Sequence, residues 1–117
     1  MNTIGREELR AKIERGDDFK LVMVLGPWEY QAKHIPGSIN LFTPEMIGEL
    51  LSVEDDIVVY CTNEICAASR YAYRKLISLG YRHVRRYSGG LEDWEAAGYL
   101  LEGDMVDEEN RLLVDAA

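Results

Sequence analysis

Four segments of the chain are predicted to form β-strands, three of them from runs of apolar and β-branched residues and the last as a further short strand. They span residues 20–25, 38–41, 56–60 and 82–87. The run at 20–25 is almost continuously apolar, which indicates a strand covered on both faces. The run at 56–60 predicts the strongest strand, because β-branched and aromatic residues favour this conformation.

Amphipathic segments separate these runs and predict helices at 3–15, 46–51, 66–79 and 91–97. Gly16, Gly80 and Gly98 stand where a helix commonly ends. The pair Gly26-Pro27 is interpreted as a break in the chain. Strands that alternate with helices predict an α/β fold, with a central parallel sheet of about five strands and helices on both faces.

The length of 117 residues suits a single core. We expect one domain over residues 1–102, followed by an acidic C-terminal extension over 103–117. No apolar run approaches the length of about 18 residues that a membrane span needs, and the start lacks the pattern of a secretory signal, so a cytoplasmic protein with no membrane partner is expected. The net charge of −8, from 13 basic and 21 acidic residues, argues against nucleic-acid binding.

The candidate chemistry lies directly after the strongest strand, at Cys61. In open α/β sheets, ligands bind beyond the carboxyl ends of the strands. A loop that enters a helix N-terminus also presents unpaired backbone N–H groups, which stabilise a thiolate. We therefore predict a lowered pKa for Cys61. The alternative is a small buried residue that only closes the strand.

Several segments resemble, in the same order, those that characterise the rhodanese family. They are His34 to Asn40, Val59-Tyr60-Cys61, Leu79-Gly80-Tyr81, and Tyr87 to Trp94 followed by Ala97-Gly98. The similarity extends over residues 3–102. It implies a single rhodanese-like domain.

The resemblance also implies an activity. In this family the cysteine at the strand end takes a sulfane sulfur from a donor, holds it as a persulfide and passes it to a nucleophilic acceptor, here a thiophilic molecule or a protein, with a thiol acceptor as the expected partner. Cys61 matches that cysteine. The implied substrate-binding loop comprises Thr62, Asn63, Glu64, Ile65, Ala67, Ala68, Ser69 and Arg70. The donor is a small molecule or a protein, and no cofactor is implied.

A second cysteine, Cys66, marks a subset of rhodanese-like domains with two cysteines in the active loop. Two interpretations are open for it. Cys66 is either a small residue that packs at the start of the following helix, or a resolving thiol that attacks a persulfide on Cys61. The loop is longer than the common rhodanese loop and lacks the basic residue often found there, so weak thiosulfate binding is expected.

Other classes of function explain the sequence less well. A related phosphatase needs an arginine where this chain has Ala67, to hold the phosphoryl oxygens. A zinc site would have only His34 and His83 to add to the two cysteines, and we expect no metal. Two alternatives to a sulfurtransferase stay open: a non-catalytic binding or regulatory module, and a thiol–disulfide redox role of Cys61 and Cys66. The oligomeric state is not predicted.

Overall fold

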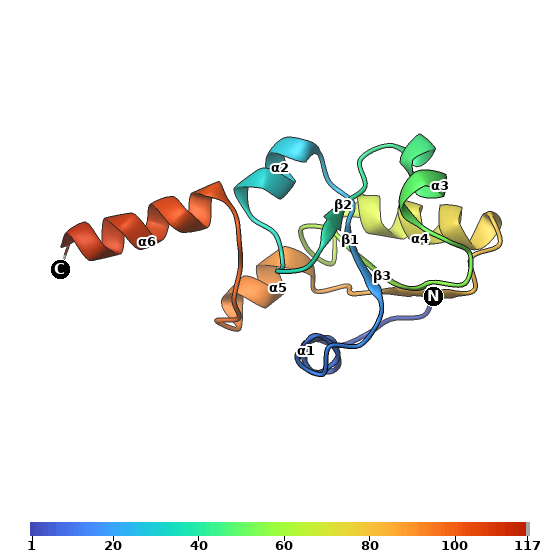
Figure 1. Ribbon diagram of the computed structural model, residues 1–117, viewed down its shortest axis with the longest axis horizontal. Coiled ribbons are helices and arrows are strands. Elements are labelled where there is room, and N and C mark those ends of the chain that lie inside the picture. Colours follow the sequence, from blue (N-terminus) through green and yellow to red (C-terminus); the bar gives the residue numbers. More distant parts are fainter. Residues whose placement is uncertain (117) are drawn as a thin grey trace.

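The computed structural model describes residues 1–116, with side chains up to residue 112 (Figure 1). The predicted α/β class is confirmed, because helices alternate with parallel strands along the chain. The elements in order are α1 (Arg6–Glu14), β1 (Lys20–Met23), α2 (Pro27–Ala32), β2 (Ile39–Asn40), the 3-10 turn η1 (Pro44–Met46), α3 (Ile47–Leu50), β3 (Asp56–Tyr60), α4 (Ala67–Ser78), β4 (His83–Arg86), α5 (Gly90–Ala96) and α6 (Asp104–Ala116).

The sheet has four parallel strands in the order β2-β1-β3-β4, and the prediction of about five strands was therefore wrong. The place beside β4 is taken by the N-terminal segment, where the backbone N–H of Ile4 donates to Arg86 O at 3.0 Å and Arg86 N–H donates to Asn2 O at 2.9 Å. Thr3 forms a single parallel bridge to Arg86. Because α1 begins at Arg6, this segment is too short to form a strand. The helix was predicted to begin at Thr3, and that prediction was wrong for the first three residues.

Helix α2 was missed, because Gly26-Pro27 was interpreted as a break. Proline instead occupies the first turn of α2, where its fixed φ suits the helix and its missing N–H costs nothing. Tyr30 of this helix donates from its hydroxyl to the carbonyl of Ser38 at 2.6 Å, which ties α2 to the segment before β2.

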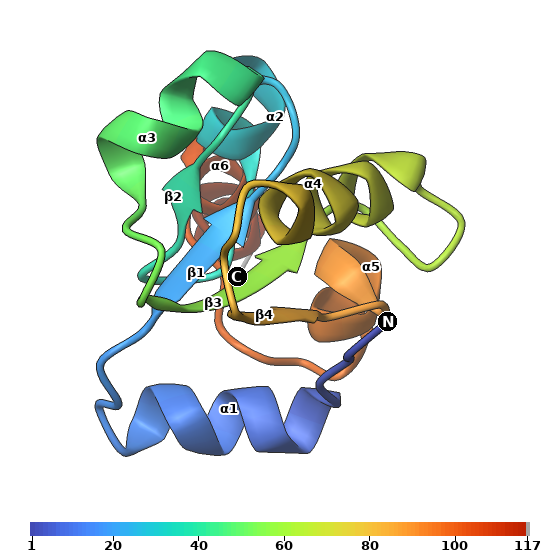
Figure 2. The same cartoon turned by 90° about the vertical axis from the view of Figure 1, so that its right-hand side faces the viewer.

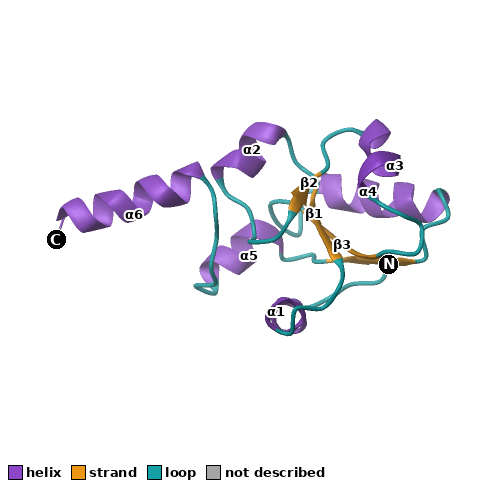
Figure 3. Cartoon of the chain, viewed as in Figure 1, coloured by secondary structure: helices purple, strands orange, loops and turns teal. Residues whose placement is uncertain are grey.

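Two apolar clusters cover the two faces of the sheet. Figures 2 and 3 show the helices that flank it on both sides. Successive strand residues point to opposite faces. Val22 and Val59 accordingly face α3 and α4, together with Leu76 of α4. Leu21 and Val58 face the other way, toward the cluster that includes residues of α1 and α5. Helices on both faces, as predicted, leave the strand ends as the edge where a site can form.

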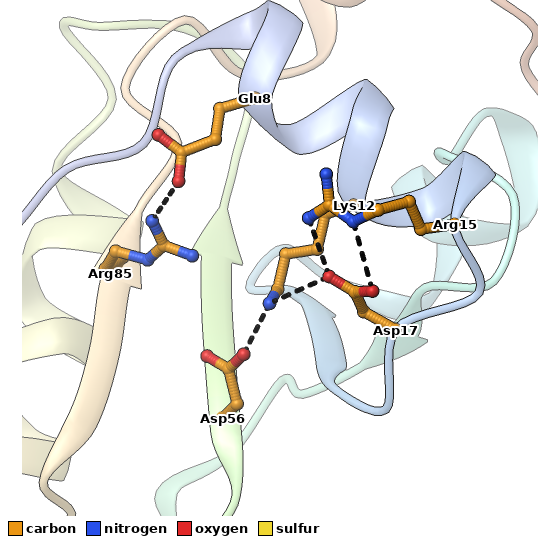
Figure 4. A network of polar contacts seen from close by, with 6 residues as sticks. All are labelled: Glu8, Lys12, Arg15, Asp17, Asp56 and Arg85. Carbon is orange, nitrogen blue, oxygen red and sulfur yellow. Dashed lines mark hydrogen bonds and ion pairs between the residues drawn. The ribbon is translucent and has the colours of Figure 1, made fainter.

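Ion pairs hold α1 against the sheet (Figure 4). Lys12, only 8% exposed, places its Nζ 2.5 Å from Asp56 Oδ2 and 3.7 Å from Asp17 Oδ2. Glu8 Oε2 lies 2.6 Å from Nη1 of Arg85 in β4. These contacts fix α1 over the amino-terminal half of β3, so they support the fold at a distance from the cysteines.

Helix α6 covers most of the predicted acidic extension and projects from the rest of the molecule (Figure 1). Ala117, the last residue of that extension, lies outside the described residues. Backbone hydrogen bonds between His34 and Glu102 anchor the segment before α6. Lys33 adds ion pairs to Glu95 of α5, at 2.6 Å, and to Glu109 of α6, at 2.9 Å. No helix within the described part of the chain is long and apolar enough to cross a membrane.

Candidate functional site

Cys61 directly follows β3, whose residues Ile57 to Tyr60 are fully buried between the two helical layers. A loop of residues 62–66 connects it to α4, and Cys66 is the N-cap residue of that helix. Figure 2 shows this loop between β3 and α4, at the carboxyl edge of the sheet. The thiol of Cys61 is covered, because the residue is 1% exposed, whereas Cys66 is half-buried.

The start of α5 holds the first part of the loop. Backbone N–H groups of Leu91 and Glu92 donate to the carbonyls of Cys61 and Thr62, each at 2.9 Å. These N–H groups belong to the first turn of α5 and lack partners within their own helix. The position of the cysteine therefore depends on the 88–90 turn as well as on β3.

Asn63 shapes the rest of the loop through its side chain. Its Oδ1 accepts hydrogen bonds from the backbone N–H groups of Ile65 and Cys66, both at 3.1 Å. Its Nδ2 donates to Glu92 Oε2 at 3.0 Å. An asparagine that bonds the backbone two and three residues ahead makes a local turn, and this turn delivers Cys66 to the N-terminus of α4.

The sulfur of Cys61 is bonded mainly to Ser69, in the first turn of α4. The Cys61 thiol donates to Ser69 Oγ at 3.1 Å, and Ser69 N–H donates to Cys61 Sγ at 3.4 Å. The thiol also approaches the carbonyl of Cys66 at 3.6 Å. The structure thus brings together three of the predicted residues, Cys61, Cys66 and Ser69.

The other predicted loop residues lie around this centre. Ile65 is 83% exposed, and Ala67 and the Glu64 side chain are also exposed. Arg70 donates from Nη2 to the carbonyl of Ile65 at 3.0 Å, so its guanidinium braces the loop backbone. Thr62 and Ala68 are half-buried. Among the side chains described, no group of three potential metal ligands is found.

Arg86, at the end of β4, is a component of the site that the sequence analysis did not include. It is 5% exposed. Its Nε donates to Ser69 Oγ at 2.8 Å and its Nη2 donates to the Glu64 carbonyl at 3.1 Å. Within the described side chains it forms no ion pair with a carboxylate. A buried charge normally has a counter-charge, and the positive charge of Arg86 favours the thiolate of Cys66, whose pKa it lowers.

The two thiols have opposite electrostatic environments. Burial raises the pKa of Cys61, and a hydrogen bond with Cys66 adds to this effect, although Ser69 opposes it. The prediction of a lowered pKa for Cys61 was therefore wrong, because desolvation outweighs the donors at the strand end. Burial also disfavours the Cys66 thiolate, but hydrogen bonds from Cys61, Thr62 and Ala68, with the charge of Arg86, lower the pKa of Cys66. The Cys66 thiol therefore ionises more readily than the Cys61 thiol.

Replacement of Arg86 should raise the pKa of Cys66, because its positive charge favours the thiolate. We expect Arg86→Met to shift the pH midpoint of Cys66 alkylation upward, measured on the Cys61→Ser background. Arg85→Met is the matched control, because Arg85 is the next residue along β4 and pairs with Glu8. Equal midpoints in the two variants would contradict the role assigned to Arg86.

Comparisons with known proteins place this site in a family. The family model described as Rhodanese-like domain matches residues 5–97. The chain therefore belongs to the rhodanese-like domain family. It is 38% identical over 99 residues to the HTH-type transcriptional regulator Rv0324 of Mycobacterium tuberculosis, a match that covers 83% of this chain and 43% of the regulator. The chain thus spans less than half of that relative.

The second relative is the thiosulfate sulfurtransferase GlpE of Pseudoalteromonas translucida, 30% identical over 83 residues that cover 69% of this chain and 77% of GlpE. Among solved structures, the BH2092 protein of Bacillus halodurans superposes with a TM-score of 0.80 at 27% identity, covering 89% of this chain and 78% of BH2092. The human single-domain sulfurtransferase TSTD1 superposes with a TM-score of 0.69 at 25% identity, covering 82% of this chain and 96% of TSTD1. These neighbours support a family of the sulfurtransferase type.

Proposed function

We propose that this protein is a sulfurtransferase that carries sulfane sulfur as a persulfide on Cys61. The observation that carries the proposal is the position and bonding of Cys61. It directly follows β3 in a rhodanese-like domain, and its sulfur is hydrogen-bonded to both the hydroxyl and the amide of Ser69. The partners are a sulfur donor and a thiol acceptor, in a cytoplasmic protein without a resident cofactor. Nucleic acid and membrane are not among them.

Loading begins when the Cys61 thiolate attacks the outer sulfur of a donor R–S–SH. A new S–S bond forms on Cys61, the donor S–S bond breaks, and the donor leaves as the thiolate R–S⁻. Arg86 already donates to Ser69 Oγ, so the Ser69 hydroxyl hydrogen is free to turn toward Cys61 once that thiol is ionised. Because Cys61 is 1% exposed, the loop of residues 62–66 opens before a donor can reach it.

Cys66 is the proposed resolving thiol. Its lowered pKa and its hydrogen bond with Cys61 make it the internal nucleophile. The Cys66 thiolate attacks the inner sulfur of the Cys61 persulfide, a Cys61–Cys66 disulfide forms, and hydrosulfide HS⁻ leaves. External reductant then restores the two thiols. An acceptor thiol that arrives before this step takes the outer sulfur instead.

A regulatory module is the second candidate function. It is favoured by the relative named an HTH-type transcriptional regulator, of which this chain matches 43%. In such a module, persulfide or disulfide formation at Cys61 and Cys66 would be the signal, and turnover would be unnecessary. Catalytic transfer to a thiol acceptor over many cycles distinguishes the enzyme from a module that reacts once.

Donor preference tests the proposal. We expect thiosulfate to be a poor donor and an organic persulfide a better one, because the arginines near the loop are engaged elsewhere. Arg70 bonds to the Ile65 carbonyl, and Arg86 lies buried beneath Ser69. The net charge of −8 also opposes a dianion.

Steady-state transfer to a common acceptor thiol measures this preference, with the Cys61→Ser variant as the blank. A kcat/KM for thiosulfate of about 10⁴ M⁻¹s⁻¹ or more would show that the charge argument is wrong. Absence of transfer from every donor, with intact fold, would leave the regulatory module as the better function.

A further inference from the structure

A groove lies beside the cysteine loop and takes no part in the chemistry above. Its volume is about 480 Å³, within the range of small-molecule sites. Residues that follow β1 and β2 form one wall, and one side of α4 from Ala67 to Lys75 forms the other. The lining includes Leu25, Phe42, Ile47, Ala68, Tyr71 and Lys75. We call this the apolar groove.

The apolar groove borders the segment that follows the cysteine loop. Ala67, which directly follows Cys66, lines it, and so does Ala68. Leu25 from the groove and Cys66 from the loop pack against the same core cluster. The groove also lies at the carboxyl ends of β1 and β2, beside the point where successive connections leave the sheet in opposite directions, which is where ligands bind in open α/β sheets.

The charge of the groove is concentrated in one residue. Lys75 is the single lining side chain with a charge at neutral pH, and the described side chains give it no ion-pair partner. It stands eight residues after Ala67 along α4, a helix rise of about 12 Å. An occupant that reaches from the loop to Lys75 is therefore extended and apolar, with an anionic group at its far end.

We propose that the apolar groove binds the acceptor, a small organic thiol with an apolar chain and one carboxylate or similar anion near Lys75. The inference rests on the proposed function for its sulfur step. In that step the acceptor thiolate R–S⁻ attacks the outer sulfur of the Cys61 persulfide, R–S–SH forms, and Cys61 leaves as the thiolate. The chain seated in the groove holds the acceptor sulfur at the loop.

Binding can be measured without any sulfur chemistry, with octanoate as the probe. In an NMR titration of the whole chain, octanoate should shift the backbone amides of Ala67, Ala68 and Ala72 with one saturable isotherm. Cys61→Ser should bind octanoate as the wild type does. Shifts elsewhere, or no saturation at millimolar octanoate, would overturn a small-molecule site and leave the groove to a protein partner.

Variants distinguish binding by Lys75 in the groove from an effect of net charge alone. Lys75→Glu should weaken octanoate binding about fivefold or more, whereas Arg74→Glu, with the same change in net charge on the neighbouring exposed residue, should change it less than about twofold. Thr43→Trp should fill the groove with a large side chain, because Thr43 is one of the residues that line it. Equal effects of the two charge reversals would contradict the assignment of Lys75.

Acceptor kinetics then connect binding to transfer. A wild-type protein loaded with persulfide should discharge to 8-mercaptooctanoate faster than to 3-mercaptopropionate, by about tenfold, and Thr43→Trp should remove this preference. Equal discharge to both thiols would overturn the acceptor role. If octanoate binds in the groove but Cys61 never loads, the sulfurtransferase proposal fails and the binding site stands.

Discussion

Cys61→Ser is expected to abolish persulfide loading, and Cys66→Ser is expected to retain it. The hydroxyl of serine is a far weaker nucleophile than a thiolate, so loading should fall by about a thousandfold or more. Loss of Cys66 removes the internal thiol that displaces sulfide, so the persulfide on Cys61 should persist several times longer. The amount of persulfide is measured by adding cyanide at timed intervals after the donor is removed, and by determining the thiocyanate that forms.

The two serine variants also serve as each other's control. Both replace a cysteine of the same hydrogen-bonded pair with a residue of similar size. The half-exposed position of Cys66 gives a clear competing outcome, because a donor can reach it more easily than the covered Cys61. Loading that survives in Cys61→Ser and disappears in Cys66→Ser would assign the nucleophile to Cys66 and contradict the proposed order.

Gly90→Ala is expected to damage the site through the backbone. Gly90 has φ +67°, and a Cβ there would lie 2.6 Å from the carbonyl oxygen of Cys61 and 2.8 Å from that of Thr62. Both carbonyls accept hydrogen bonds from the first turn of α5, so the methyl group would separate the loop from that turn. We expect a loss of stability of about 3 kcal/mol and a large loss of persulfide loading.

Gly98→Ala provides the matched control for this substitution. Gly98 has φ +77°, but a Cβ there meets no atom within 4 Å. The substitution Gly98→Ala should therefore lower the stability of the fold only by the strain of the left-handed conformation, about 1 kcal/mol, and leave persulfide loading unchanged. Thermal unfolding and persulfide loading are measured for both variants. The difference between them gives the effect of the close contacts at Gly90. Equal losses in both would show that α5 does not position the cysteine loop.

The strands and the reactive loop were predictable because their signals are local. An uninterrupted apolar run at Ile57–Tyr60 buries β3, and the residue after a buried parallel strand falls at the edge where ligands bind. The sequence analysis could therefore name Cys61, Cys66 and Ser69. In contrast, α2 was missed because a proline can mark either a break in the chain or the first turn of a helix. Pro27 alone therefore did not distinguish the two.

The electrostatics of the site were not predictable in the same way. Arg86 stands beside Arg85 in the sequence and has the same charge, yet Arg86 is buried under Ser69 while Arg85 pairs with Glu8. Alternation along β4 offered a signal, because it places neighbouring residues on opposite faces. The pKa of Cys61 depended on burial by the loop, which no local pattern encodes.

In the proposed reaction, Cys61 carries the sulfur and Cys66 resolves the persulfide. Timed intact-mass measurements on the wild-type chain, after brief exposure to an organic persulfide and its removal, test this most directly. We expect first a gain of about 32 Da, which peptide mapping assigns to Cys61. This species should then give way to a product about 2 Da lighter than the reduced chain, with a Cys61–Cys66 disulfide. A gain that maps to Cys66, or no gain at all, would show that Cys61 does not carry the sulfur.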